Sequence, residues 1–96
     1  MGGLLRAIDL ANMAKQSGIG CIVGAQVGET SLLTRAGMVA ALACHENLLA
    51  QEGAFGLYLL EHDVCAKSLM FGKQGKIITS EHDCFNKPGF GLDIDI

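Results

Sequence analysis

A short apolar run ends in a glycine-rich turn that carries one acidic residue, Glu29. The run covers residues 19–24, and the turn leads into Thr30 and Ser31, which can begin a helix. A carboxylate in a loop that follows a strand can stand at the mouth of a site, because α/β proteins place chemistry in such loops. The same carboxylate could instead stabilise the helix dipole alone, worth about 0.3–1 kcal/mol. Glu52, just before the second predicted strand, has the same two interpretations, with less support from the residues around it.

Residues 24–30 have a superficial likeness to a phosphate-binding loop. The glycines are one residue closer together than in the G-x-x-x-x-G-K-[ST] pattern, and Glu29 stands where that pattern has lysine. A carboxylate at this position would repel phosphate. The sequence therefore argues against a nucleotide site.

Two short segments repeat a mixture of acidic, histidine and cysteine residues. Histidine and cysteine are zinc ligands, and two such pairs could complete a tetrahedral site. The spacings differ, H-x-x-C in one segment and H-x-C in the other, and neither matches a common finger or ribbon. Two solvated polar loops are the simpler interpretation. The zinc alternative would use His62, Cys65, His82 and Cys84.

Length and composition are those of one small soluble domain. The chain has 96 residues, half of them apolar, and a net charge of −3. Its seven Lys and Arg are scattered, so it offers no basic surface for nucleic acid. The longest apolar run, residues 36–44, is shorter than the roughly 20 residues that span a bilayer. Without a signal peptide, we expect a cytoplasmic protein with reduced thiols and no membrane partner.

The elements that must position these residues alternate between helix and strand. Apolar residues three and four apart predict a helix over 4–16, and residues 19–24 are typical of a strand buried on both faces. A second helix is expected over 31–46. Its middle is apolar nearly all round, which implies cover from more than one side. With a second strand expected over 53–60, the order favours a parallel α/β sheet.

After residue 61 the pattern weakens. Short extended pieces are expected at residues 69–71 and 76–79. A turn is expected at residues 87–91, and the alternation in residues 92–96 predicts an edge strand.

Taken in order, these motifs resemble the carboxyl-terminal part of the mandelate racemase and muconate lactonizing enzyme group of the enolase superfamily. Residues 1–4, Met-Gly-Gly-Leu, are similar to the family's Lys-x-Gly-Gly-Leu at the sixth barrel strand. Residues 26–31, Gln-Val-Gly-Glu-Thr-Ser, are similar to its Glu-Thr-Ser signature after the seventh strand. Residues 52–56 are similar to the eighth strand. Residues 87–95, Lys-Pro-Gly-Phe-Gly-Leu-Asp-Ile-Asp, are similar to the closing Gly-Pro-Gly-Leu-Gly-Val-x-Val-Asp.

The resemblance implies an α/β fold in which residues 1–96 form a single partial domain. This domain would be the last part of a (β/α)8 barrel, about two βα units and a tail. It also implies isomerase chemistry, racemisation, epimerisation or cycloisomerisation. Family members remove the proton α to a carboxylate, and a divalent metal, usually Mg²⁺, stabilises the enediolate. The metal ligands and the lysine bases would all precede Met1. We therefore expect the chain alone to hold no cofactor and to be inactive.

The resemblance assigns few site residues to this chain. Glu29 would take a supporting catalytic role in the hydrogen-bond network of the active site, and no residue would bind metal. The substrate would be a small carboxylate. Dipeptides are less expected, because residues 53–56 lack the Asp-x-Asp of dipeptide epimerases. Residues that would contact the substrate are Gln26, Thr30 and Phe55.

The expected partner is the missing amino-terminal part of the barrel, or a second copy of the chain. Two functions of other classes stay open. One is a stand-alone α/β interaction module that oligomerises to bury its apolar helix. The other is the small zinc-binding domain described above.

Overall fold

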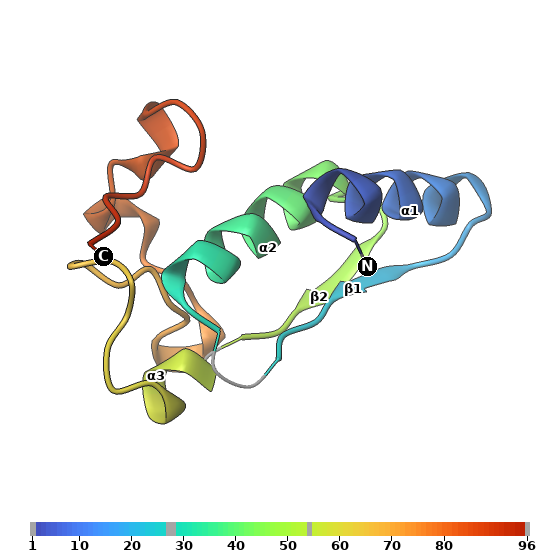
Figure 1. The fold of residues 1–96 in the computed structure, drawn as a ribbon. Coiled ribbons are helices and arrows are strands. Elements are labelled where there is room, and N and C mark those ends of the chain that lie inside the picture. The colour runs from blue at the N-terminus through green and yellow to red at the C-terminus, as the bar shows by residue number, and fades with distance from the viewer. Residues whose placement is uncertain (1, 27–28, 54, 96) are drawn as a thin grey trace. The chain divides into compact units, whose positions relative to one another are not determined.

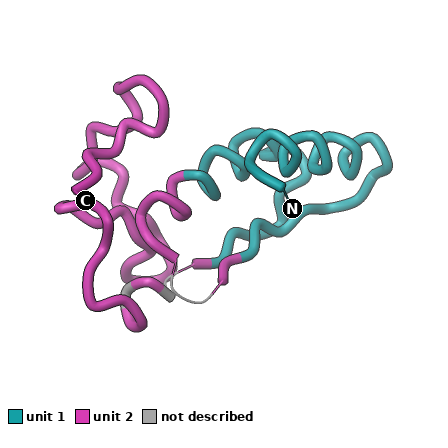
Figure 2. The backbone as a smooth tube through the Cα atoms, in the orientation of Figure 1, with its two compact units in different colours: residues 1–24, 36–52 teal, residues 25–35, 53–96 magenta. Residues whose placement is uncertain are grey.

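The computed structural model describes residues 2–26, 29–53 and 55–95, without the side chains of Phe55 and Leu57. The chain divides into two compact units (Figure 2). Unit 1 comprises residues 1–24 and 36–52, and unit 2 comprises residues 25–35 and 53–96. Each unit is described by itself below.

Unit 1 holds most of the regular secondary structure, whose elements are labelled in Figure 1. Helix α1, Leu4–Gln16, has the predicted bounds, and strand β1, Cys21–Val23, lies inside the predicted strand. Helix α2, Ser31–Ala43, begins where predicted and ends three residues earlier than the expected Glu46. Its first turn belongs to unit 2 and the rest to unit 1.

The second strand lies earlier in the chain than predicted. Strand β2 is Leu48–Gln51, and the predicted strand at residues 53–60 is wrong, because Phe55–Leu59 forms the short helix α3. The ladder ends where the Glu52 N–H donates to the Val23 carbonyl (2.9 Å). In α3 the hydrogen bonds are local, as in the Leu60 N–H to the Gly56 carbonyl (3.4 Å).

The two strands pair in parallel, as the helix–strand order predicted. Ile22 is opposite Ala50 and Val23 is opposite Gln51, with a register irregularity between Cys21 and Ile22. Gly37 of α2 lies against the side chains of Val23 and Gln51. Because side chains alternate along a strand, Ile22 and Ala50 point to the face away from α2.

That second face of the sheet is uncovered in unit 1. Ile22 is 58% exposed, and its partner Ala50 is exposed as well. Among the described side chains of unit 1, only Ala41 and Cys44 are buried. Leu42 of α2 is exposed too. Unit 1 therefore does not supply the packing that was expected around the apolar middle of α2.

Unit 2 has little regular structure but buries more of its side chains. Leu69 is fully buried, and Phe71, Cys65 and Cys84 are also buried. Besides α3, its elements are 3-10 turns at Lys73–Gly75, Thr79–Glu81 and Cys84–Asn86.

The extended pieces predicted for this unit are wrong for the described residues. Residues 69–71 and 76–78 form no strand, and Thr79 begins a 3-10 turn. The expected edge strand at 92–96 is reduced to one antiparallel bridge between Ile94 and Cys65; its last residue lies outside the described ranges.

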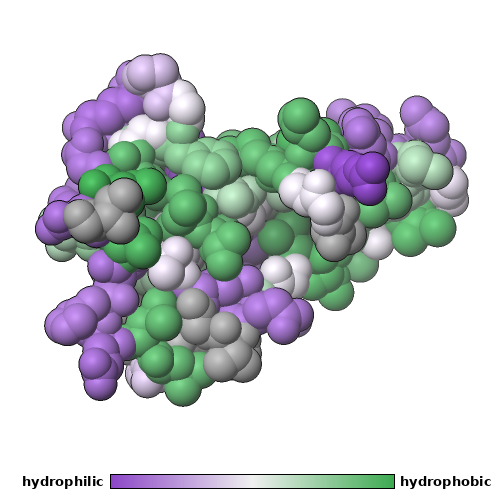
Figure 3. Space-filling model, in the orientation of Figure 1, coloured by the Kyte–Doolittle hydropathy of each residue, from purple (hydrophilic) through white to green (hydrophobic). Residues whose placement is uncertain are grey.

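Hydrophobic residues occupy much of the visible surface (Figure 3). In the described ranges, no helix combines the length and the hydropathy needed to cross a bilayer.

Candidate functional site

The loop after β1 holds its acidic side chain in a defined position. The Gln26 N–H donates to Oε1 of Glu29 (2.7 Å); residues 27–28 lie outside the described ranges. The Thr30 carbonyl accepts from the Thr34 N–H (3.0 Å) as α2 begins. Gln26 is exposed and Glu29 is half-buried, so the carboxylate is oriented by the backbone yet open to a ligand.

The backbone of α3 lies directly against this loop. A Cβ placed on Gly56 would be 2.1 Å from the Glu29 carbonyl oxygen, so only glycine fits there. The structure therefore brings the Glu29 loop together with the end of the segment that resembles the eighth strand, whose residues 55 and 56 belong to α3. Phe55 begins α3, and its side chain lies outside the described part.

A buried polar cluster lies at the first residue of α2. Ser31 is fully buried, and its N–H donates to both carboxylate oxygens of Asp63 (3.1 and 3.2 Å). Its hydroxyl donates to Asp63 as well and accepts from the Leu69 N–H (2.7 Å). A carboxylate at a helix N-terminus satisfies free backbone N–H groups and complements the dipole, so this cluster anchors α2 within unit 2.

Asp63 is ionised more readily than an ordinary aspartate. Its burial alone would raise the pKa, but hydrogen bonds from the Ser31 hydroxyl and N–H outweigh it and hold the pKa below the ordinary 3.8. Sequence reasoning missed this residue. It noticed the Glu-His-Asp segment, but assigned chemistry to the histidine and cysteine beside Asp63.

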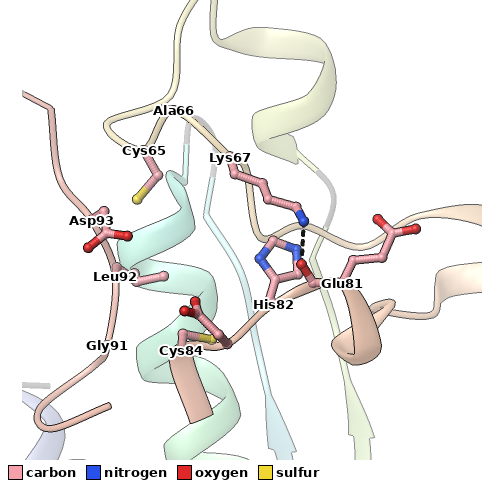
Figure 4. Close-up of a pocket in the computed structure, with 10 residues that line it drawn as sticks. Cys65, Ala66, Lys67, Glu81, His82, Cys84, Gly91, Leu92 and Asp93 are labelled. Carbon is pink, nitrogen blue, oxygen red and sulfur yellow. Dashed lines mark hydrogen bonds between the residues drawn. The ribbon is translucent and has the colours of Figure 1, made fainter. Parts of the chain in front are cut away.

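Three of the four residues of the zinc alternative line one cavity of unit 2, of about 300 Å³ (Figure 4). They are Cys65, His82 and Cys84. The fourth, His62, is exposed and is not in the lining. Across residues 2–26, 29–53 and 55–95, no three His, Cys, Asp or Glu side chains are grouped closely enough to hold a metal ion. The geometry therefore gives the zinc alternative no support.

Most charged side chains around this cavity already interact with partners within the protein. The Lys67 amine donates to the Glu81 carbonyl, the dashed contact in Figure 4. Lys87 pairs with Asp83 (3.2 Å) and Asp93 (3.1 Å). Burial, with the nearby carboxylates of Asp63 and Asp93, raises the pKa of the Cys65 thiol, so it is a poor nucleophile at neutral pH. The cavity thus favours a packing role over catalysis.

Arg35 attaches the carboxyl-terminal turns to α2. Its side chain is buried, only 8% exposed, and its Nε donates to the Phe90 carbonyl (3.1 Å). The guanidinium lies over the Phe85 ring, 4.7 Å from the centroid, a cation–π contact.

Of the predicted site residues, the structure brings Gln26 and Glu29 together and places Thr30 at the start of the same helix. The described contacts of the Glu29 carboxylate use only Oε1. A carboxylate held at one oxygen can accept a hydrogen bond at the other from a ligand or from a neighbouring protonated base.

No protein-family model matches this chain, and no curated protein sequence or solved structure matches it either.

Proposed function

We propose that this chain is the carboxyl-terminal portion of a (β/α)8-barrel enzyme similar to the mandelate racemase and muconate lactonizing enzyme group. That enzyme would remove the proton α to the carboxylate of a small substrate. The observation that carries the proposal is the uncovered apolar face of the β1–β2 sheet, where Ile22 and Ala50 are exposed. Parallel sheets are almost always covered on both faces, so this face calls for more structure.

A barrel would supply that structure in a specific way. The inward face of barrel strands is filled by layers of branched side chains from alternate strands, and Ile22 is a suitable residue for such a layer. A complete barrel takes about 250 residues, so two βα units need further strands to close it. On this proposal, the remaining strands come from polypeptide outside these 96 residues.

Within such an enzyme, Glu29 would act as a supporting carboxylate. Barrel sites lie at the carboxyl ends of the strands, and Glu29 follows that end of β1. Its Oε1 is fixed by the Gln26 N–H, which leaves Oε2 to orient a protonated base or a substrate hydroxyl. The described residues contain no cluster that fits Mg²⁺, so the proposal places the metal ligands elsewhere and derives no step through a metal from this chain.

Sedimentation velocity on the purified chain tests the structural half of the proposal. With an uncovered sheet face, the chain alone should associate or aggregate, and Ile22→Lys should reduce the association because a charge disfavours burial of that face. Asp9→Lys is the control, because it also introduces a lysine, at an exposed position of α1. A monodisperse monomer with a cooperative melt would count against an incomplete barrel.

Solvent deuterium exchange tests the chemical half. The protein that contains this chain together with its other strands should exchange the α-proton of a small carboxylate in D2O with Mg²⁺, and a chelator should stop the exchange. Glu29→Gln should lower the exchange rate about 10- to 100-fold, whereas Glu81→Gln should not. Equal rates for the two variants would remove Glu29 from the site.

The second candidate is a self-associating α/β module, which the same uncovered face also favours. It predicts one defined oligomer of the chain with a cooperative melt. It also predicts no exchange under any condition. The proposed enzyme predicts the reverse pattern.

A further inference from the structure

Two thiols of unit 1 lie on either side of one asparagine. Cys21 begins β1, and Cys44 directly follows α2, with its N–H still bonded to the Ala40 carbonyl (3.1 Å). The Cys21 N–H donates to the Asn47 carbonyl (2.8 Å), and the Asn47 N–H donates to the Cys44 carbonyl (3.0 Å). A single backbone hydrogen bond therefore separates each cysteine from Asn47.

The two side chains also point into the same layer. Cys21 and Val23 are two residues apart in β1 and so share a face, the one that Gly37 of α2 lies against. Cys44 comes two helical turns after Gly37 on the same side of α2, and it is 3% exposed. Both thiols are therefore directed between α2 and the sheet.

We propose that Cys21 and Cys44 form a reversible disulfide that fixes the beginning of β1 to the end of α2. Both are free thiols in this structure. The oxidant would be a low-molecular-weight disulfide such as glutathione disulfide. This inference goes beyond the proposed function and does not depend on it.

The surroundings assign an order to the two steps. Cys21 is half-buried, so a reagent can reach its thiol. Its sulfur accepts a hydrogen bond from Asn47 Nδ2 (3.2 Å), which fixes the side chain. Cys21 therefore reacts first. Burial and the neighbouring Cys21 raise the pKa of the Cys44 thiol, so Cys44 reacts second.

The exchange balances in atoms and electrons. The Cys21 thiolate attacks glutathione disulfide, which forms a mixed disulfide and releases one glutathione thiolate. The Cys44 thiolate then attacks the Cys21 sulfur and releases the second glutathione. Overall the two protein thiols lose two electrons and two protons, and glutathione disulfide is reduced to two glutathione molecules.

Peptide mapping of the full protein in a glutathione redox buffer tests the proposal. Cleavage after Lys, Arg and Glu separates all four cysteines, with Cys21 in residues 16–29 and Cys44 in residues 36–46. The expected product is a cross-link between these two peptides that dithiothreitol reverses. Cys21→Ser should abolish it, and Cys65→Ser, the matched control, should leave its yield unchanged.

A parallel reaction in concentrated urea shows whether the fold directs the pairing. The pairs 21–44, 44–65 and 65–84 have nearly equal separations along the chain, so loop closure in an unfolded chain should favour none of them strongly. We expect the 21–44 cross-link to exceed the other two at least fivefold in native buffer and to lose that excess in urea. Equal yields in both solvents, or glutathione adducts without a cross-link, would overturn the proposal.

Discussion

Unit 1 has most of the regular secondary structure, whereas unit 2 has more of the buried side chains. Unit 1 contains α1, the parallel sheet and most of α2, yet only Ala41 and Cys44 are buried among its described side chains. Unit 2 consists mostly of turns and loops, yet it buries Leu69 completely and Ser31 with it. Regular secondary structure and buried side chains are therefore concentrated in different units of this protein.

The difference shows what each unit requires. Unit 2 satisfies its buried polar groups by itself, since Asp63 and Leu69 complete the hydrogen bonding of Ser31. Unit 1 satisfies its backbone through helices and a ladder but leaves its apolar face open. Backbone hydrogen bonds add little net stability, whereas buried apolar area adds much, so unit 1 is the part that its own packing stabilises less.

Replacing a leucine by alanine should give the largest difference in stability effect between the two units. Leu69→Ala should lower the free energy of unfolding of unit 2 by about 2–5 kcal/mol, because it leaves a cavity at a fully buried site. Leu49→Ala, at a 72% exposed site of β2, should change the stability of the chain alone by less than about 0.5 kcal/mol. Urea unfolding measures both. A large effect of Leu49→Ala would mean that this side chain of β2 is already covered in the chain alone.

The Asp63 cluster should give unit 2 a dependence on acid. Asp63→Asn should cost about 1.5–3 kcal/mol, the range for hydrogen bonds to a charged group, whereas Asp9→Asn at an exposed site should be neutral. The pKa of Asp63 is lowered on folding, so its contribution is fully present above the unfolded value near 3.8 and is lost as pH falls through the lower folded value. Hydrogen exchange at the Ser31 and Leu69 amides should report both changes. Protection that persists in Asp63→Asn would remove Asp63 as the anchor.

Two glycines of unit 2 test how closely its backbone is packed. Gly89 and Gly91 both have left-handed backbone, with φ of +64° and +68°. A Cβ on Gly89 meets nothing within 4 Å, whereas one on Gly91 would be 2.1 Å from the Cys84 carbonyl oxygen. Alanine should cost about 1–2 kcal/mol at Gly89 for the conformation alone, and clearly more at Gly91. Thermal melts compare them, and equal losses would contradict the close approach.

The smallest effect should come from the surface of unit 1. Lys15 Nζ lies 2.5 Å from Glu46 Oε2, and this pairing lowers the pKa of Glu46, but both side chains are about half exposed. Exposed ion pairs are screened by water and salt, so Glu46→Gln should leave the melting temperature unchanged within error at physiological salt. A clear loss would show that regular surface contacts stabilise unit 1 more than its open face suggests.

Local patterns were sufficient to predict most elements of unit 1, but not β2. Helix α1, strand β1, the start of α2 and the parallel pairing follow from short-range periodicity and order. The second strand was predicted at residues 53–60, whereas β2 is Leu48–Gln51. In the structure, Gly53 lies against the Phe71 ring and Gly56 against the Glu29 carbonyl. Such close approaches depend on tertiary neighbours that no local pattern contains.

In the candidate site, too, only contacts between residues near each other in the sequence could be predicted. Glu29 and Gln26 lie three residues apart, and their hydrogen bond is local. The bond between Ser31 and Asp63 joins residues 32 apart, and the Arg35 contact with Phe90 joins residues 55 apart. Nothing in the residue types selects those partners over other acceptors.

The attachment of Arg35 determines the order in which unit 2 should come apart in acid. The Phe90 carbonyl and the Phe85 ring that hold the guanidinium do not titrate, whereas the carboxylate at the start of α2 does. Acid should therefore release the segment around Asp63 first and leave the carboxyl-terminal turns on α2. The acid-unfolded protein would then be a partly ordered intermediate, in which the tail is the last segment to detach.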